Sequence, residues 1–354
     1  GVIVALNVIG LINVFSATHG HGEVIGSDRL FWSQLFWLFS GWAVYFVVTI
    51  VDYNLIVRMA WVIYAINLIA LIAVMFVGKV ALGAQRWLDF GFFSYQPSET
   101  MKIALVLVLA KSMSQRSYPD GLGLKELLFP LVILIGVPFL ITAEQPDLGT
   151  AMMLFVIGCS VLFFLRIKRK ILIAVGIVFA LGGIGAWFFA LHDYQRDRIY
   201  TFLDPDRDPR GKGYNSIQSK IAVGSGKVFG KGFRKGTQSQ LEFLPERHTD
   251  FIFSVLSEEH GFIGSMTTVG LFAALFVFGI GIAQKARDKV GAIVVVGVVA
   301  TLFWHQFINI SMVIGLLPIV GIPLPLVSYG GSNMLTTMAA LGLVSSVSYR
   351  KHMF

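Results

Sequence analysis

The chain has 354 residues, of which 56% are hydrophobic and 14% are charged, and its formal net charge is +8. Soluble domains carry roughly a quarter charged residues, so the composition excludes an ordinary soluble enzyme and a disordered linker. A single cysteine, Cys159, excludes within this sequence an intramolecular disulfide, a zinc site built from cysteines and an iron–sulfur cluster held by one chain.

Long runs without Asp, Glu, Lys or Arg predict the membrane spans, because about 20 apolar residues are needed to cross the hydrocarbon core. The runs that each predict one helix are Gly1–Gly22, Leu30–Val51, Met59–Gly78, Leu127–Ala143, Leu148–Leu165, Ile171–His192 and His260–Gln284. A shorter helix is expected over Pro97–Ser112. The 60-residue run Val290–Tyr349 is interrupted by glycines and prolines, so it predicts two helices joined by a re-entrant or surface hairpin.

The expected fold is therefore an all-α polytopic membrane protein with about ten transmembrane helices, forming a single integral membrane domain over residues 1–354. With both termini on the cytoplasmic side, the inner loops hold 13 Lys or Arg residues and the short outer loops hold 3. This asymmetry fits the positive-inside rule. The positive net charge is then mainly an orientation signal and does not indicate nucleic-acid binding. No cleavable signal peptide is expected at the start of the chain.

One segment, His192–Asp250, breaks the apolar pattern between the seventh and eighth spans. It holds 11 Lys or Arg and 8 Asp or Glu residues in 59 positions, which predicts an extracytoplasmic loop over residues 192–250. Loops of this length are usually functional or disordered. Disorder would suit the stretch Asp204–Gly213, but aromatic residues recur through the loop, and these favour an ordered lid packed on the helix ends.

The sequence does not match the motifs of soluble nucleotide-binding proteins. Gly224-Ser225-Gly226-Lys227 resembles a phosphate-binding loop, but Val228 follows where Ser or Thr is required. No HExxH zinc motif occurs, and His19-Gly20-His21 alone is a weak metal signal. We therefore expect no tightly bound cofactor and no dedicated metal site.

The remaining candidates are polar groups at the outer helix ends. Glu99 and Lys102 are three residues apart, hence neighbours on one helical face, and charges at this depth usually face a bundle interior or a water-filled cavity. A structural and a functional role for this pair are equally compatible with the sequence. Asp147 is expected to cap a helix. Asp250 could cap the eighth helix, or it could face a cavity as a general base, and spacing alone favours the cap.

Several motifs together resemble the SEDS family (shape, elongation, division and sporulation), more its elongation branch than its division branch. The likeness covers nearly the whole chain in order. It is carried by Trp87, Gln96–Glu99 with Lys102, Gln145–Thr150, Arg198–Pro205, Gly213-Tyr214-Asn215, Gln218-Ser219, Gly236–Gly261 and Gly321–Ser332.

The resemblance implies a peptidoglycan glycosyltransferase that polymerises lipid II, an undecaprenyl-pyrophosphate disaccharide-peptide, at the outer face of the bacterial cytoplasmic membrane for elongation and shape. It implies a class B penicillin-binding protein as partner, besides membrane lipids, and a divalent cation (Mg or Mn) that is not tightly held. Carried over by position, Asp250 matches the essential outer aspartate, which overturns the capping expectation, and Glu99 and Lys102 match a functionally important charged pair.

The chemistry agrees with this topology. A sugar transferred outside the membrane must arrive already activated on a lipid pyrophosphate, and an inverting displacement needs one base for the acceptor hydroxyl, here Asp250. Cations must screen the leaving pyrophosphate, and Lys102, Arg86, Arg198 and Arg247 are the candidates to bind it. Two alternatives stay open: a lipid II flippase or transporter gated by the Glu99–Lys102 pair, and a non-catalytic scaffold that recruits a penicillin-binding protein.

Overall fold

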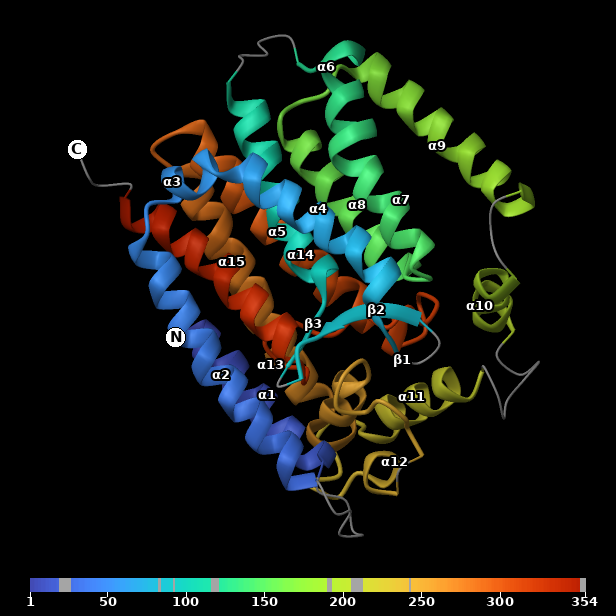
Figure 1. Cartoon of the computed structure of the whole chain (residues 1–354). Coiled ribbons are helices and arrows are strands. Elements are labelled where there is room, and N and C mark those ends of the chain that lie inside the picture. The colour runs from blue at the N-terminus through green and yellow to red at the C-terminus, as the bar shows by residue number, and fades with distance from the viewer. Residues whose placement is uncertain are drawn as a thin grey trace.

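The computed structural model describes residues 1–18, 27–81, 84–91, 93–115, 121–189, 193–204, 213–241 and 243–350. In this part of the chain, long helices form a bundle with a small sheet and short helices at one end (Figure 1). The helical segments are α1 (Val2–Thr18), α2 (Ser27–Ile50), α3 (Tyr53–Arg58), α4 (Ala60–Val77), α5 (Pro97–Ser114), α6 (Leu124–Leu128), the π-helical η1 (Phe129–Gly136), α7 (Val137–Glu144), α8 (Leu148–Phe164), α9 (Arg169–Phe189), α10 (Asp193–Leu203), α11 (Tyr214–Ser225), α12 (Thr237–Gln240), α13 (Ile252–Gln284), α14 (Lys289–Val313) and α15 (Gly331–Arg350).

A helix lies in every stretch where the sequence predicts a span. Among the described residues, five helical stretches are long and apolar enough to cross a membrane, and α1 and α8 are shorter apolar helices. The number of crossings, about ten, stays a prediction. The predicted division of the run Val290–Tyr349 is confirmed, because α14 ends at Val313 and α15 begins at Gly331.

Large apolar side chains cover the flanks of the bundle. Phe36 and Phe39 of α2 are 62% and 68% exposed, and Phe76 of α4 is 79% exposed. Soluble proteins rarely expose contiguous apolar surface on this scale, whereas lipid solvates it. The outer surface of these helices is therefore suited to hydrocarbon.

Helix α5 lies in the core of the bundle, between α4, α8 and α14. Nearly all of its apolar side chains from Met101 to Ala110 are buried. Close approach to α14 depends on Gly297, since a Cβ there would lie 2.4 Å from Cγ1 of Val106. Small residues at helix contacts allow such approach in membranes. Because α5 is packed tightly, the charged residues at its first turn are held in fixed positions.

The span predicted over Leu127–Ala143 is one continuous helical stretch, Leu124–Glu144, with a π-helical middle. Pro130 and Pro138 begin successive parts of it. Proline removes a helical N–H donor and crowds the carbonyl four residues earlier, so the backbone widens locally instead of breaking.

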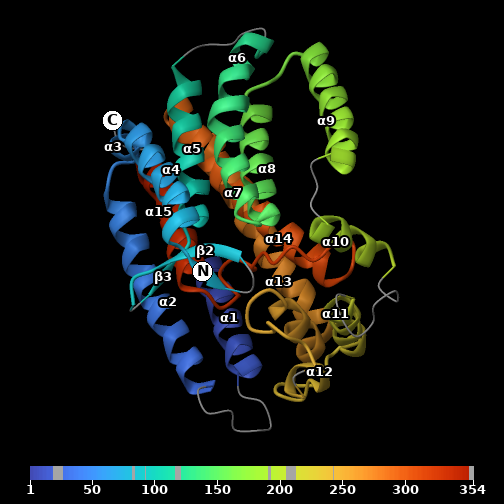
Figure 2. The same cartoon turned by 45° about the vertical axis from the view of Figure 1, so that its right-hand side comes forward.

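A three-stranded antiparallel sheet, which the all-helical prediction did not include, connects α4 to α5. Its strands are β1 (Lys79–Ala81), β2 (Ala84–Asp89) and β3 (Ser94–Tyr95), in the order β1-β2-β3. The strands are too short to give a clear period-two pattern in the sequence. The sheet lies across the same end of the bundle at which α5 and α8 begin (Figure 2).

Helix α13 begins eight residues before the predicted span His260–Gln284 and is kinked at Gly261, whose φ is 65°. Residues 226–232 dock at the kink: the Phe262 amide donates to the Lys227 carbonyl at 2.9 Å, and the Lys231 amide donates to the Glu258 carbonyl at 2.9 Å. A Cβ at Gly261 would lie 2.3 Å from the Gly230 nitrogen, so glycine is required there.

The charged segment predicted over residues 192–250 contains α10, α11 and α12 in its described part. Helix α11 packs against α13, and its Ser219 hydroxyl donates to the Val313 carbonyl at 3.1 Å. Helices α11 and α12 are therefore folded onto the helix ends. Residues 205–212, most of the stretch considered for disorder, lie outside the described residues.

Candidate functional site

A cavity of about 230 Å³ opens at the end of the bundle where α5, α8 and α13 begin. Its lining combines strand β2, the N-terminal ends of α5, α8 and α15, the segment before α13, helix α14 and the turn before α15. The lining residues are Arg86, Trp87, Gln96, Glu99, Lys102, Asp147, Thr150, Met153, Glu246, Thr249, Asp250, His305, Gly321, Ile322, Pro323, Tyr329, Gly330, Ser332 and Asn333.

Asp250 is half-buried in the cavity wall, and its backbone is fixed by α14. The Asn309 side-chain amide donates to the Asp250 carbonyl at 2.8 Å and to the Ile322 carbonyl at 2.7 Å. One buried amide therefore joins the segment carrying Asp250 to the turn carrying Gly321. A buried hydrogen-bonded network of this kind restricts the backbone to one arrangement.

The turn before α15 holds the same segment from the other side. Ser328 donates its hydroxyl to the Thr249 carbonyl at 2.7 Å, and the Tyr329 amide donates to the His248 carbonyl at 2.9 Å. The rings of His248 and Tyr329 meet edge to face, with centroids 5.7 Å apart. Burial lowers the pKa of His248 below its ordinary value, so its imidazole is neutral near pH 7.

Asp250 stands one residue before the N-cap position of α13. The N-cap position of α13 is Phe251, which makes no side-chain capping bond, and the Thr249 hydroxyl donates to the Glu246 carbonyl. Gly321 approaches Asp250 closely, since a Cβ there would lie 3.2 Å from the Oδ2 atom of Asp250, and the φ of Gly321 is 72°. Glycine at 321 therefore leaves room for the carboxylate.

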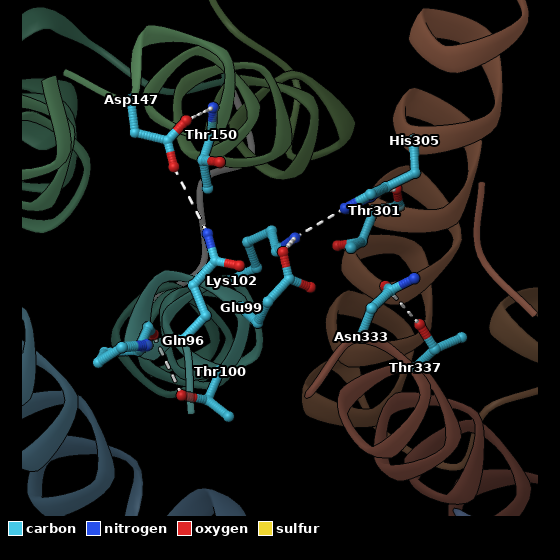
Figure 3. A network of polar contacts seen from close by, with 11 residues as sticks. Gln96, Glu99, Thr100, Lys102, Asp147, Thr150, Thr301, His305, Asn333 and Thr337 are labelled. Atoms are coloured by element: carbon cyan, nitrogen blue, oxygen red, sulfur yellow. Dashed lines mark hydrogen bonds and ion pairs between the residues drawn. The ribbon is translucent and has the colours of Figure 1, made fainter. Parts of the chain in front are cut away.

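Glu99 and Lys102 form a buried ion pair in the first turns of α5, with 2.7 Å between Lys102 Nζ and Glu99 Oε1. Their side chains are 7% and 2% exposed. His305 of α14 completes the group, since its Nε2 lies 2.7 Å from Lys102 Nζ (Figure 3). The helix N-terminus adds partial positive charge beside Glu99. The three side chains point toward one another between α5 and α14.

Asp147 caps α8, as predicted, because its Oδ1 accepts from the Thr150 amide at 3.2 Å. Its other oxygen, Oδ2, lies 3.5 Å from Gln96 Nε2 and 3.7 Å from Arg86 Nε. Arg86 also donates to the Pro146 carbonyl. These contacts connect strand β2 to the N-termini of α5 and α8 at the cavity mouth. They also fix the guanidinium of Arg86 at that place.

Four of the predicted site residues line this one cavity: Arg86, Glu99, Lys102 and Asp250. Arg247 is not among the lining residues, and its contact with pyrophosphate stays a prediction. Its Nε donates to the Ala17 carbonyl and its Nη1 to the Ser239 carbonyl, both at 2.7 Å, so the guanidinium anchors the segment 244–250 to α1 and α12. The Arg198 side chain lies outside the described residues.

His305 and Asn309 were not predicted as site residues. Residues 290–349 contain no Asp, Glu, Lys or Arg, so formal charge alone does not reveal the neutral polar residues inside this run. They are four residues apart and share one face of a helix. That spacing within an apolar helix was the signal that could have identified both.

A protein cage for a divalent cation would need several oxygen ligands, whereas Mg²⁺ is usually held by one or two carboxylates together with water and substrate phosphates. Among the described residues, no three His, Cys, Asp or Glu side chains are grouped to hold a metal ion. Glu99 is paired with Lys102, and Asp147 caps α8 beside Arg86. The described residues therefore show no protein cage for a metal ion.

Comparison with known proteins shows the family of this chain. Residues 1–353 match the family model FTSW_RODA_SPOVE, described as "Cell cycle protein". The chain is 46% identical over 291 residues to the peptidoglycan glycosyltransferase MrdB of Escherichia coli K12, covering 82% of this chain and 78% of MrdB. It is 35% identical over 352 residues to stage V sporulation protein E of Bacillus subtilis, covering 96% of this chain and 93% of that protein.

Solved structures agree with the fold. A chain from a peptidoglycan synthase complex, described as coordinating polymerization and crosslinking, matches with a TM-score of 0.84 and 27% identity, covering 100% of this chain and 97% of that one. The rod shape determining protein RodA of Thermus thermophilus matches with a TM-score of 0.72 and 24% identity, covering 100% and 96%.

The predicted family and the helical membrane fold are thus confirmed. The chain is a multi-pass membrane protein and belongs to the SEDS family, the family of FtsW, RodA and stage V sporulation protein E.

Proposed function

We propose that this protein is a peptidoglycan glycosyltransferase that polymerises lipid II into glycan strands for cell elongation and shape. The observation that carries the proposal is the cavity in which a carboxylate, Asp250, lies in one wall with the cations Lys102 and Arg86 in others. The relatives named peptidoglycan glycosyltransferase match most of the chain, which supports the same activity here.

Asp250 acts as the general base. Its carboxylate takes the proton of the acceptor sugar hydroxyl, whose oxygen then attacks the anomeric carbon of the donor from the face opposite the pyrophosphate. The new glycosidic C–O bond forms as the bond to the lipid pyrophosphate breaks, so the anomeric centre is inverted. General base catalysis typically contributes about 10²- to 10⁴-fold to a rate.

The cations hold the leaving pyrophosphate, which departs as an anion. Lys102 is fixed by Glu99 and supplies a compact positive charge, and Arg86 at the cavity mouth supplies a planar group suited to phosphate oxygens. Charges fixed before the reaction need no reorganisation when negative charge develops. Glu99 thus acts on the substrate through Lys102. Mg²⁺ or Mn²⁺ from solution would add screening, and we assign it no ligands.

The site faces the outside of the bacterial cytoplasmic membrane, and both termini face the cytoplasm. The distribution of Lys and Arg between loops supports this orientation. A class B penicillin-binding protein crosslinks the strands, a pairing supported by the structural match to a peptidoglycan synthase complex. Membrane lipids surround the bundle, and no nucleic-acid partner is proposed.

A lipid II transporter is the competing function, favoured only by the buried charge pair on α5. Reconstitution in vesicles with labelled lipid II separates the two. We expect glycan strands from the wild-type protein and little transfer of lipid between leaflets. Rapid transfer between leaflets without polymer would overturn the proposal and support the transporter.

A further inference from the structure

His305 is a buried histidine on the cavity side of α14 and has no assigned role. Its side chain is 3% exposed and it lines the cavity with Lys102. Both ring nitrogens are in contact: Nε2 lies 2.7 Å from Lys102 Nζ, and Nδ1 lies 2.7 Å from the Thr301 carbonyl oxygen. Figure 3 shows the ring between α14 and the lysine of α5.

These two contacts determine which nitrogen carries the hydrogen. A carbonyl oxygen can only accept a hydrogen bond, so the contact with Thr301 requires a hydrogen on Nδ1. In a neutral imidazole the other nitrogen, Nε2, is then an acceptor. A protonated ring would put an imidazolium 2.7 Å from the ammonium of Lys102. The ring is therefore neutral and accepts from Lys102.

The Lys102 ammonium has three N–H groups. One donates to Glu99 Oε1 and a second to His305 Nε2, each at 2.7 Å. Both partners lie on the helices that enclose the lysine, α5 and α14, so two of its hydrogens have fixed directions. The third is left for a group in the cavity, which Lys102 lines.

Glu99 alone would leave this ammonium poorly oriented. A lysine has four rotatable side-chain bonds, and one contact three residues earlier on the same helix fixes only one direction. The second contact comes from a different helix and 203 positions along the chain. It prevents the ammonium from rotating about its bond to Glu99.

We propose that His305 is a positioning residue that holds Lys102 as a directed cation for the lipid pyrophosphate. The proposal deepens the proposed function and rests on it for the identity of the ligand. His305 itself does not touch the reacting atoms. Its contribution is the acceptor at Nε2, which any side chain with an oxygen at that place can supply.

Two substitutions at position 305 show whether the residue acts by positioning Lys102 or only by filling the space between the helices. His305→Gln places an amide oxygen near Nε2, within reach of Lys102, whereas His305→Asn reaches only the place of Nδ1. We expect the Gln variant to polymerise lipid II within about threefold of wild type. The Asn variant is expected to be slower by about 10- to 100-fold, because it loses a hydrogen bond to a charged group.

Thermal unfolding in detergent provides the structural readout. Both variants are expected to be folded at the assay temperature, the Asn variant with a lower unfolding temperature because it loses the hydrogen bond to Lys102. If the Asn variant does not fold, His305→Met, which has similar length and no strong acceptor, takes its place. Equal polymerisation by the Gln variant and by a folded variant without the acceptor would overturn the proposal while leaving the glycosyltransferase function intact.

A double-mutant cycle on ligand binding tests the positioning of Lys102 by His305 without measuring polymerisation. Farnesyl pyrophosphate is titrated into the full chain carrying Lys102→Met, His305→Asn or both. We expect each single change to weaken binding by about tenfold or more, and the double variant to bind no more weakly than Lys102→Met alone. Additive losses would overturn the proposal. A protein that binds the probe, follows this cycle and makes no glycan would support the role of His305 and contradict the proposed function.

Discussion

The ion pair between Glu99 and Lys102 is buried in the first turns of α5, where removal of one partner leaves the other charge without compensation. For Lys102→Ala we expect loss of polymerisation and a loss of about 3 kcal/mol in the free energy of unfolding. The double variant Glu99→Gln with Lys102→Ala should recover most of the stability and none of the activity.

Thermal unfolding and polymerisation measured on the same preparations check both parts of this expectation. Recovery of activity in the double variant would show that the pair serves the fold alone. Unchanged stability in the single variant would mean that water reaches the remaining carboxylate, against the burial seen in the structure.

His248 makes the stability of the cavity wall depend on pH. Burial lowers its pKa in the folded protein below the ordinary value of 6.5. The unfolded chain therefore binds the proton more readily, so this stabilisation is fully present above pH 6.5 and is lost as the pH falls. We expect His248→Phe, which keeps the ring contact with Tyr329, to show a smaller drop in unfolding temperature between pH 7 and pH 5. The same drop in both proteins would contradict this assignment.

At the scale of elements, the turn before α15 determines how much room Asp250 has. Gly321→Ala adds a Cβ 3.2 Å from the Asp250 carboxylate at a positive φ. We expect it to lower polymerisation by at least tenfold and stability by about 1 kcal/mol. Gly91→Ala is the matched control, because Gly91 has a φ of 83° and nothing within 4 Å of an added Cβ.

The control should lose similar stability and keep its activity. Polymerisation assays on Gly321→Ala and Gly91→Ala measure this difference in activity. An equal loss of activity in the two would mean that backbone strain, and not the approach to Asp250, is responsible.

The long helices were predictable because uninterrupted apolar runs have few other stable structures in lipid. The sheet formed by β1, β2 and β3 was not predictable, because its strands are short. The kink at Gly261 was not predictable either, because it depends on residues 226–232 docking against it. The site was predictable only in part. The contact between Lys102 and His305 depends on the packing of α5 against α14, which no local pattern encodes.

In the whole molecule, polymerisation outside the cell requires the cavity end of the bundle to face outward. Replacing Cys159 by Ser leaves no cysteine in this sequence. Single cysteines introduced into this variant can then show on which side of the membrane each position lies. Lys235→Cys, in the segment folded onto the cavity end, should react with a membrane-impermeant maleimide in intact cells. Lys285→Cys, between α13 and α14, should react only after permeabilisation. The opposite pattern would contradict the orientation.

The proposed mechanism depends on Asp250 as the general base, and the rate of glycan formation by Asp250→Asn measures that role. The amide keeps the size of the side chain and cannot take the acceptor proton. We expect a variant with unchanged unfolding temperature that polymerises labelled lipid II at least about a hundredfold more slowly than wild type. A folded Asp250→Asn protein that polymerises within twofold of the wild-type rate would contradict it.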